Sequence, residues 1–148
     1  MIIGTPKEKL KDESRVALTP NSAQNLINLG YECIIESNAG LSSDYTDQDY
    51  LNVGVKVLKS KKELWESSDI IIKVKSPDKT EEDLFKKKQI LISFFYPNEN
   101  KKLLKKLADK GVTTLALDMV PRISRAQKMD ALSSMANIAG YRSVIEAS

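Results

Sequence analysis

The chain of 148 residues has no histidine and only one cysteine. Without histidine it lacks both the commonest general base and the commonest metal ligand, which excludes histidine-dependent catalytic triads and zinc sites. We therefore expect no metal. A single cysteine cannot form a disulfide within the chain, so the composition suits a reducing compartment. Because Cys33 lies in an apolar run, residues 31–35, we expect it to be a buried structural thiol.

Glycine and long apolar runs are also scarce. The chain has six glycines, and nowhere do they give the G-x-G-x-x-G spacing that lets backbone approach a dinucleotide. We therefore do not expect the chain alone to hold a dinucleotide tightly. The longest apolar runs, such as residues 90–95, are far shorter than the roughly 20 residues needed to cross a bilayer. No basic leader precedes an apolar region at the start, so we expect neither a signal peptide nor a transmembrane segment.

Neither sign of charge dominates, because 23 Lys and Arg residues oppose 20 Asp and Glu residues and leave a net charge of +3. The basic runs at residues 59–62, 86–88 and 101–106 are rich in lysine and contain no aromatic residue. A protein that binds single strands combines a basic groove with rings on which bases stack. We therefore expect no nucleic-acid partner and interpret these runs as solvated helix faces.

Short β-rich runs alternate with polar, helix-capable segments along the whole chain. That alternation is typical of parallel strands joined by helical crossovers. Residues 70–72 and 115–117 are apolar at every position, as in strands whose two faces are both covered by helices. The length suits one domain. We predict an α/β domain with strands at residues 2–3, 31–36, 55–58, 69–74, 89–95 and 113–119.

The clearest helix signal begins at Thr19, which precedes Pro20 as a capping residue, and ends at Gly30. Similar signals predict helices at residues 46–52, 61–66, 80–86, 100–110 and 135–147. The last of these meets no stop signal, so we expect the chain to belong to a larger architecture.

Residues 120–134 gather charged, amide and hydroxyl side chains in one loop after an apolar strand, where α/β proteins hold ligands. Gln127 and Asp130 are three residues apart, so both would project from one face of a helix that begins near them. Arg122 offers a planar fork of donors to a carboxylate, a phosphate or Asp130 itself. A plainer interpretation is that Arg122 pairs with Asp130 while Ser124 caps the following helix.

Continued through residue 142, this loop closely resembles the nicotinamide-contacting loop of the alpha subunit of proton-translocating NAD(P) transhydrogenases, relatives of alanine dehydrogenase. The order of motifs at residues 6–8, 13–20 and 72–77 supports the same resemblance. It implies a Rossmann-like (flavodoxin-like) three-layer domain with a mainly parallel sheet over residues 1–148, and a C-terminal NAD-binding domain that is absent from this chain. It also implies that Arg122, Gln127 and Asp130 engage the nicotinamide as catalytic and cofactor-binding residues, with Ser133 close by.

The resemblance further implies the cofactors and partners of a transhydrogenase. NAD(H) would bind the complete subunit and NADP(H) a partner subunit, and hydride exchange would be coupled to proton movement through membrane subunits. The NAD-binding part would be a homodimer that lies in the cytoplasm against the inner membrane, or on the matrix face in mitochondria.

Arg15 and Lys75 match positions that hold the substrate in alanine dehydrogenases. Lys73 competes with Lys75, because alternation places both on the same side of a strand, although chemistry alone predicts a surface lysine at each position. Tyr96 stands where alanine dehydrogenases have a catalytic histidine. Hydride transfer between two nicotinamides needs alignment rather than an acid or base, so the resemblance favours a transhydrogenase. The alternatives are an alanine dehydrogenase or saccharopine dehydrogenase-like domain, or a non-catalytic interaction domain with an exposed apolar patch.

Overall fold

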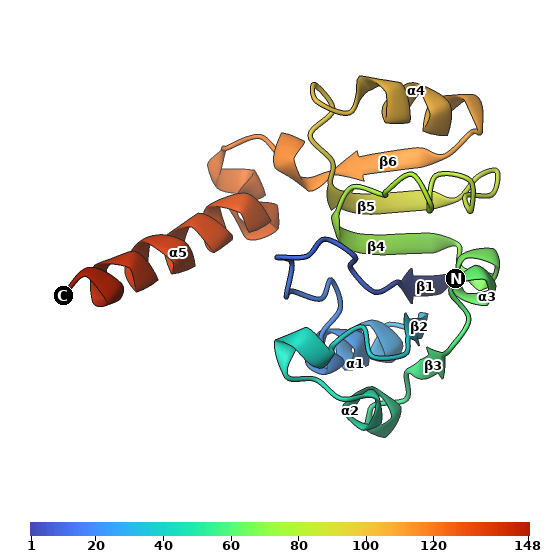
Figure 1. The fold of residues 1–148 in the computed structure, drawn as a ribbon, viewed down its shortest axis with the longest axis horizontal. Helices are drawn as coiled ribbons and strands as arrows, with labels where there is room; N and C mark the ends of the chain where they lie inside the picture. Colours follow the sequence, from blue (N-terminus) through green and yellow to red (C-terminus); the bar gives the residue numbers. More distant parts are fainter.

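The computed structural model describes residues 1–148 as one six-stranded parallel sheet with the strand order β3-β2-β1-β4-β5-β6 (Figure 1). The predicted Rossmann-like α/β class is confirmed. The strand order is that of the six-stranded Rossmann sheet rather than the 2-1-3-4-5 order of flavodoxin. The strands are β1 (Ile2–Thr5), β2 (Glu32–Glu36), β3 (Lys56–Leu58), β4 (Ile70–Lys75), β5 (Ile90–Phe94) and β6 (Thr113–Ala116).

The chain starts in the middle of the sheet, builds outward through β2 and β3, and then returns to add β4, β5 and β6 on the other side. The connections therefore leave β1 and β4 in opposite directions. In open α/β sheets, ligands bind at such a switch point, outside the carboxyl ends of the strands.

Local capping explains where three helices begin. Thr19 accepts a hydrogen bond from the backbone N–H of Ser22, and Thr46 forms a reciprocal capping box with Asp49. Ser60 accepts from the N–H of Glu63 in the same way. The helices are α1 (Pro20–Asn28), α2 (Asp47–Asn52), α3 (Lys61–Ser67), α4 (Lys101–Asp109) and α5 (Ala131–Ala147).

Two apolar clusters cover the two faces of the sheet and make the three predicted layers. One includes Ala23 of α1 and Tyr50 of α2, together with Cys33, which is 1% exposed as predicted. The other includes Trp65 of α3 and Leu107 of α4.

Strand β4 lies between the two clusters, with Ile71 in one and Ile70 and Ile72 packed against the other, so its apolar residues do not need to alternate with polar ones. The same expectation is wrong for residues 115–117, because β6 is an edge strand and Leu115 is 51% exposed.

The predicted helix at residues 80–86 is wrong, because turns occupy residues 79–84. The Asp78 carboxylate accepts from the backbone N–H groups of Thr80 and Glu81, which closes a local turn. The Glu81 side chain is then buried and binds Lys61 and Lys73, contacts that the helical pattern does not include. Long-range charge contacts override the local helix propensity here.

Two other boundaries differ from prediction by three or more residues. The strand predicted at residues 113–119 ends at Ala116 and continues as the 3-10 helix η2 (Leu117–Met119). The last helix begins at Ala131 rather than at residue 135, because the Asp130 side chain accepts from the N–H of Ser133 and caps it.

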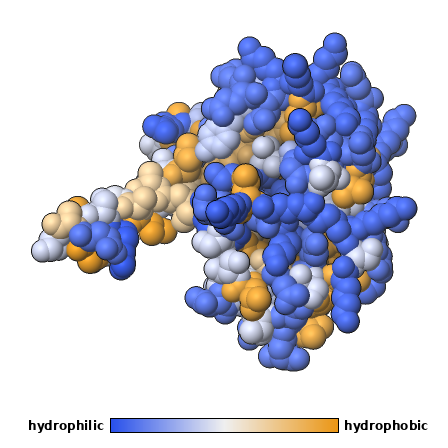
Figure 2. Space-filling model, in the orientation of Figure 1, coloured by the Kyte–Doolittle hydropathy of each residue, from blue (hydrophilic) through white to orange (hydrophobic).

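Helix α5 projects away from the body of the domain, and none of its residues is buried (Figure 1). Beyond Met135 its large apolar side chains are exposed, including Ile138, Tyr141 and Val144 at 59%, 74% and 69%. Figure 2 shows mostly apolar and weakly polar residues along this helix, whereas the visible surface of the body is mainly hydrophilic. No helix of the structure combines the length and apolarity needed to span a membrane.

We expect Gly4→Ala to lower the free energy of unfolding by about 1–3 kcal/mol, because overpacking forces neighbours to shift. A Cβ atom at Gly4 would lie 2.0 Å from the Ser68 hydroxyl oxygen and 3.1 Å from Leu64 Cδ2. Urea unfolding measures the difference. Gly140→Ala is the control, since a Cβ atom there meets nothing within 4 Å. Equal stability of the wild type and Gly4→Ala would contradict the expected clash.

Candidate functional site

The candidate side chains lie at or after the carboxyl ends of β1, β4 and β6. Lys75 is the last residue of β4, and Arg122 follows the 3-10 helix that continues β6. Arg15 lies on the connection between β1 and α1, which leaves the same edge of the sheet. The fold thus brings three distant parts of the chain to the edge where parallel α/β sheets bind ligands.

Asp130 organises the loop before α5. Its carboxylate accepts from the backbone N–H of Ser133 at 2.9 Å and from the Ser133 hydroxyl at 2.5 Å. These hydrogen bonds, helped by the positive charge of Arg122, lower the pKa of the Asp130 carboxyl group below its usual value. Ser124 is not the helix cap that the plainer interpretation required, because it begins the separate 3-10 helix η3 (Ser124–Met129). An ionised Asp130 therefore caps α5 itself.

All four residues assigned to the nicotinamide by resemblance line one hollow of about 300 Å³. Its lining consists of Arg122, Ile123, Ser124, Gln127, Asp130 and Ser133. Arg122 and Asp130 do not form an ion pair within 4.0 Å, and the Arg122 and Gln127 side chains are exposed. The hollow therefore offers a guanidinium group, an amide and an ionised carboxylate to a ligand.

Arg15 and Lys75 share one acidic neighbour, Glu13. The Glu13 carboxylate accepts from Arg15 Nε at 2.7 Å and from Arg15 Nη2 at 2.6 Å, and it lies 3.9 Å from Lys75 Nζ. These three residues line a hollow of about 500 Å³ with other residues of the 10–15 loop. The Nε and Nη2 groups of the Arg15 guanidinium are thus already hydrogen-bonded to Glu13.

Chemistry alone predicted a surface lysine at residue 73. Lys73 is instead buried, with 3% of the residue exposed. Its Nζ lies 2.9 Å from Glu81 Oε2 and 3.6 Å from Glu8 Oε2. Lys75, with 35% of its side chain exposed, remains the lysine that is open to a ligand. The pairing of β4 with β5 also shifts register between Ile72 and Lys75, so simple alternation does not hold at this end of the strand.

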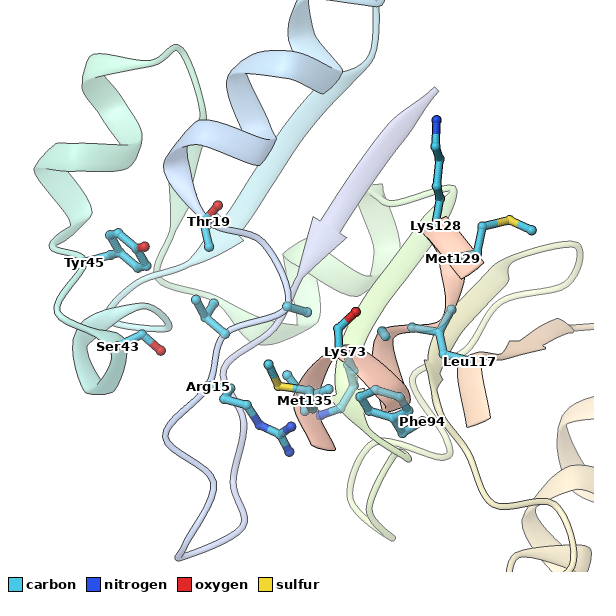
Figure 3. A pocket seen from close by; sticks show the side chains of 15 residues that line it. Arg15, Thr19, Ser43, Tyr45, Lys73, Phe94, Leu117, Lys128, Met129 and Met135 are labelled. Carbon is cyan, nitrogen blue, oxygen red and sulfur yellow. The ribbon is translucent and has the colours of Figure 1, made fainter. Parts of the chain in front are cut away.

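The largest hollow, about 600 Å³, lies beside the candidate nicotinamide loop rather than at its predicted residues. Lys128, Met129 and Met135 line it, whereas Gln127, Asp130 and Ser133 line the smaller hollow. Residues 127–135 therefore separate the two spaces. In Figure 3, Thr19, Ser43 and Tyr45 lie on one side of this space and Leu117, Lys128 and Met129 on the other. The larger space could take the apolar part of a ligand whose charged end meets Arg15.

Several polar residues of this region were missed by sequence reasoning. Asp118 accepts from the backbone N–H groups of Phe95 and Tyr96, and Glu8 accepts from that of Val74. Glu13 lies within the motif at residues 13–20, two residues before Arg15, but no local pattern indicates the partners of Glu8 or Asp118. No group of three or more histidine, cysteine, aspartate or glutamate side chains is arranged to hold a metal ion.

We expect Glu13→Gln to lower the free energy of unfolding by about 1.5–3 kcal/mol at neutral pH, since hydrogen bonds to a charged group are lost. Arg15 lowers the pKa of Glu13 from 4.5, chiefly through its side-chain hydrogen bond. A lowered pKa in the folded state contributes stability above pH 4.5 that disappears as the pH falls through the folded value. The stabilities of wild type and variant should therefore converge in acid.

Urea unfolding over a pH series tests this expectation. Glu66→Gln is the control, because the Glu66 side chain is 63% exposed in its pair with Lys62. A gap between wild type and Glu13→Gln that stays constant with pH would contradict the assigned role of the Glu13 charge.

Comparisons with known proteins show which sequences this chain resembles. A sequence model described as the alanine dehydrogenase/PNT N-terminal domain matches residues 4–139. The NAD(P) transhydrogenase subunit alpha of Cereibacter sphaeroides is 54% identical over 147 residues, which are 99% of this chain and 28% of that subunit. The alanine dehydrogenase of Methanococcus maripaludis is 38% identical over 144 residues, which are 97% of this chain and 38% of that enzyme.

Solved structures agree with the sequence comparisons. A transhydrogenase from Sinorhizobium meliloti has a TM-score of 0.93 and 37% identity, with 99% of this chain and 44% of that chain covered. An L-alanine dehydrogenase has a TM-score of 0.78 and 37% identity, with 81% and 33% covered. The chain thus spans less than half the length of each of these relatives.

Proposed function

The chain belongs to the alanine dehydrogenase/PNT N-terminal domain family, and on that premise we propose that it positions the nicotinamide of NAD(H) in an NAD(P) transhydrogenase alpha subunit. The observation that carries the proposal is the single hollow lined by Arg122, Gln127, Asp130 and Ser133. In this reaction a hydride passes between NAD(H) and NADP(H), both supplied as bound cofactors.

The three polar groups have complementary tasks in binding a nicotinamide. The carboxamide of the ring has both a donor and an acceptor, which the Gln127 amide can match. Asp130 adds an acceptor whose ionised form is stabilised by Ser133 and Arg122. Each carboxylate oxygen that accepts from Ser133 still has another lone pair for a ligand. Arg122 can bind a cofactor phosphate or balance the Asp130 charge.

Hydride transfer between two nicotinamide rings requires the donor and acceptor carbons to be held at near-attack distance, which is a task of orientation. No proton has to be moved by a side chain, so a domain without histidine is sufficient. The cofactors supply the chemistry, and the side chains of this domain supply alignment.

The remaining parts of the proposed assembly lie outside residues 1–148. A C-terminal domain with a glycine-rich loop would hold the rest of NAD(H), and NADP(H) would be held by a partner subunit. Two alpha subunits would form a homodimer. Membrane subunits would couple hydride transfer to proton translocation, with this domain in the cytoplasm, or the mitochondrial matrix, beside the inner membrane.

In the complete transhydrogenase, we expect Gln127→Ala to slow single-turnover hydride transfer by about 10- to 100-fold, because a small misplacement of a reactant has a cost of this order. The dissociation constant of NADH should change much less. Stopped-flow transfer to an NADP analogue and NADH fluorescence titration measure the two quantities. Arg125→Ala is a matched control, since Arg125 is exposed on the same 3-10 helix and lines neither hollow. Normal transfer in Gln127→Ala would refute the proposed role.

The second candidate is an alanine dehydrogenase-like domain, favoured by the convergence of Arg15 and Lys75 on one hollow. Glu13 opposes it by occupying one edge of the Arg15 fork, although the outer Nη1 edge makes no hydrogen bond within the chain. Tyr96 also opposes it, because imine hydrolysis needs a positioned acid or base and tyrosine is a poor base at neutral pH. Alanine-dependent reduction of NAD by the complete protein would favour this candidate.

A non-catalytic interaction domain is the third candidate, and the exposed apolar residues of α5 are the feature that it predicts. The same residues are expected in a helix that joins two domains. Hydride transfer by the complete protein distinguishes this candidate from the first.

A further inference from the structure

The carboxyl end of β5 has two backbone N–H groups beyond its last strand residue, at Phe95 and Tyr96. The neighbouring strand β6 ends opposite Ser93, so it offers no acceptor to them. The Asp118 carboxylate takes both instead, with Oδ1 2.6 Å from Phe95 N and Oδ2 3.0 Å from Tyr96 N. One side chain of η2 therefore closes the end of the adjacent strand.

The turn that Asp118 holds is conformationally unusual. Tyr96 has a φ of 50°, in the left-handed region that few residues other than glycine adopt. Its carbonyl oxygen accepts from the backbone N–H groups of Glu99 and Asn100, at 3.0 and 3.1 Å. The Asn100 amide also donates to the Phe95 carbonyl oxygen at 2.7 Å. Such a conformation persists where the surroundings fix it from several sides, and Asp118 fixes the N–H side.

Asp118 also attaches the segment that follows β6, residues 117–148, to the rest of the domain through hydrogen bonds. The other hydrogen bonds and ion pairs made by residues 117–148 join near neighbours within this segment, such as Ser133 to Asp130 and Arg142 to Glu146. The two hydrogen bonds of Asp118 span 22 and 23 residues of sequence. Apolar packing supplies the rest of the attachment, with Ala126 as the buried apolar residue of the loop.

We propose that Asp118 is a positioning residue that fixes the loop carrying Arg122, Gln127 and Asp130 against the end of β5. The proposal rests on the proposed function, because its consequence is the alignment of the nicotinamide. A carboxylate suits this role, since it presents an acceptor oxygen to each N–H group. Asparagine presents one oxygen and one amide donor, so it would lose one hydrogen bond and set a donor against the other N–H group.

The test is Asp118→Asn in the complete transhydrogenase, with Asp109→Asn as control because Asp109 is exposed on α4 and forms no ion pair. Amide hydrogen exchange should become at least about 10-fold faster at Phe95 and Tyr96, because their opening costs less, while amides of the buried strand residue Leu91 keep their protection. Hydride transfer should slow by about 10- to 100-fold, through misplacement of the loop, with little change in NADH affinity. Protection at Leu91 also shows that the variant is folded.

Two results would overturn the proposal. Unchanged exchange at Phe95 and Tyr96 would show that Asp118 does not hold the turn. Faster exchange with normal hydride transfer, in a preparation where Gln127→Ala is slow, would show that the turn does not position the loop and would leave the proposed function intact. If Gln127→Ala is normal as well, the proposed function itself fails, and the positioning role fails with it.

Discussion

Lys73→Met is expected to lower the free energy of unfolding by about 3–5 kcal/mol, because it removes one partner from a buried set of charges. The Lys73 and Glu81 side chains are 2% and 1% exposed, and Glu8 on the other side of Lys73 is 6% exposed. Without the ammonium group, Glu8 and Glu81 would face each other with less compensation. Burial already raises the pKa of Glu8, and Lys73 is the largest influence that opposes this rise.

This set of charges links separate segments of the fold, so the loss of Lys73 should affect more than its immediate surroundings. Glu81 also accepts from Lys61 of α3 at 2.8 Å, and Glu8 accepts from the Val74 N–H of β4 at 2.7 Å. The network therefore joins the connections after β1 and β4, the two strands that flank the switch point. Its loss should loosen the edge of the sheet where the candidate site lies.

Urea unfolding at neutral pH measures the effect, and Lys62→Met is the matched control. Lys62 forms an ion pair with Glu66 on the same helix, but the two side chains are 75% and 63% exposed. Loss of this exposed ion pair should lower the free energy of unfolding by less than about 1 kcal/mol. A similar loss in the two variants would mean that burial does not distinguish the two lysines.

Trp65→Ala is expected to cost about 3–5 kcal/mol, because it removes a large buried side chain and leaves a cavity. Trp65 is 0% exposed in the cluster between the sheet and the helices α3 and α4. Its ring meets that of Phe85 edge to face, with centroids 4.7 Å apart. Phe85 lies on the turn-rich segment that was predicted to be a helix, so Trp65 also fastens this segment to the sheet.

Trp65→Phe separates the packing of the ring from its polar group. The indole Nε1 is buried without a hydrogen-bond partner, so its removal should offset part of the lost volume. Denaturation should therefore show a much smaller loss for Trp65→Phe than for Trp65→Ala. Equal losses in the two variants would contradict the assigned role of ring packing at Trp65.

The elements governed by local rules could be predicted from the sequence. Thr19, Thr46 and Ser60 are capping residues whose partners lie three residues away, so the starts of α1, α2 and α3 agree with prediction within one residue. The start of α5 was missed although its cap is equally local. Asp130 and Ser124 both fit the capping pattern, and only the intervening 3-10 helix shows which of them begins α5.

The features that could not be predicted depend on partners far away in sequence. Glu81 binds Lys61 across 20 residues, and Glu8 contacts the Val74 N–H across 66 residues. No periodic pattern encodes such contacts. The nicotinamide residues were assigned from the resemblance of one loop to a known family, and their gathering in one hollow agrees with that assignment without testing it.

Helix α5 extends from these residues to a point far from the body of the domain. Its 17 residues extend about 26 Å at 1.5 Å per residue, and Asp130 and Ser133 lie at its base. A partner that moves the far end by about 2 Å would rotate the base by about 5°, as simple geometry requires for a rod of that length. A displacement at the tip would thus reach the hollow as a small change in angle.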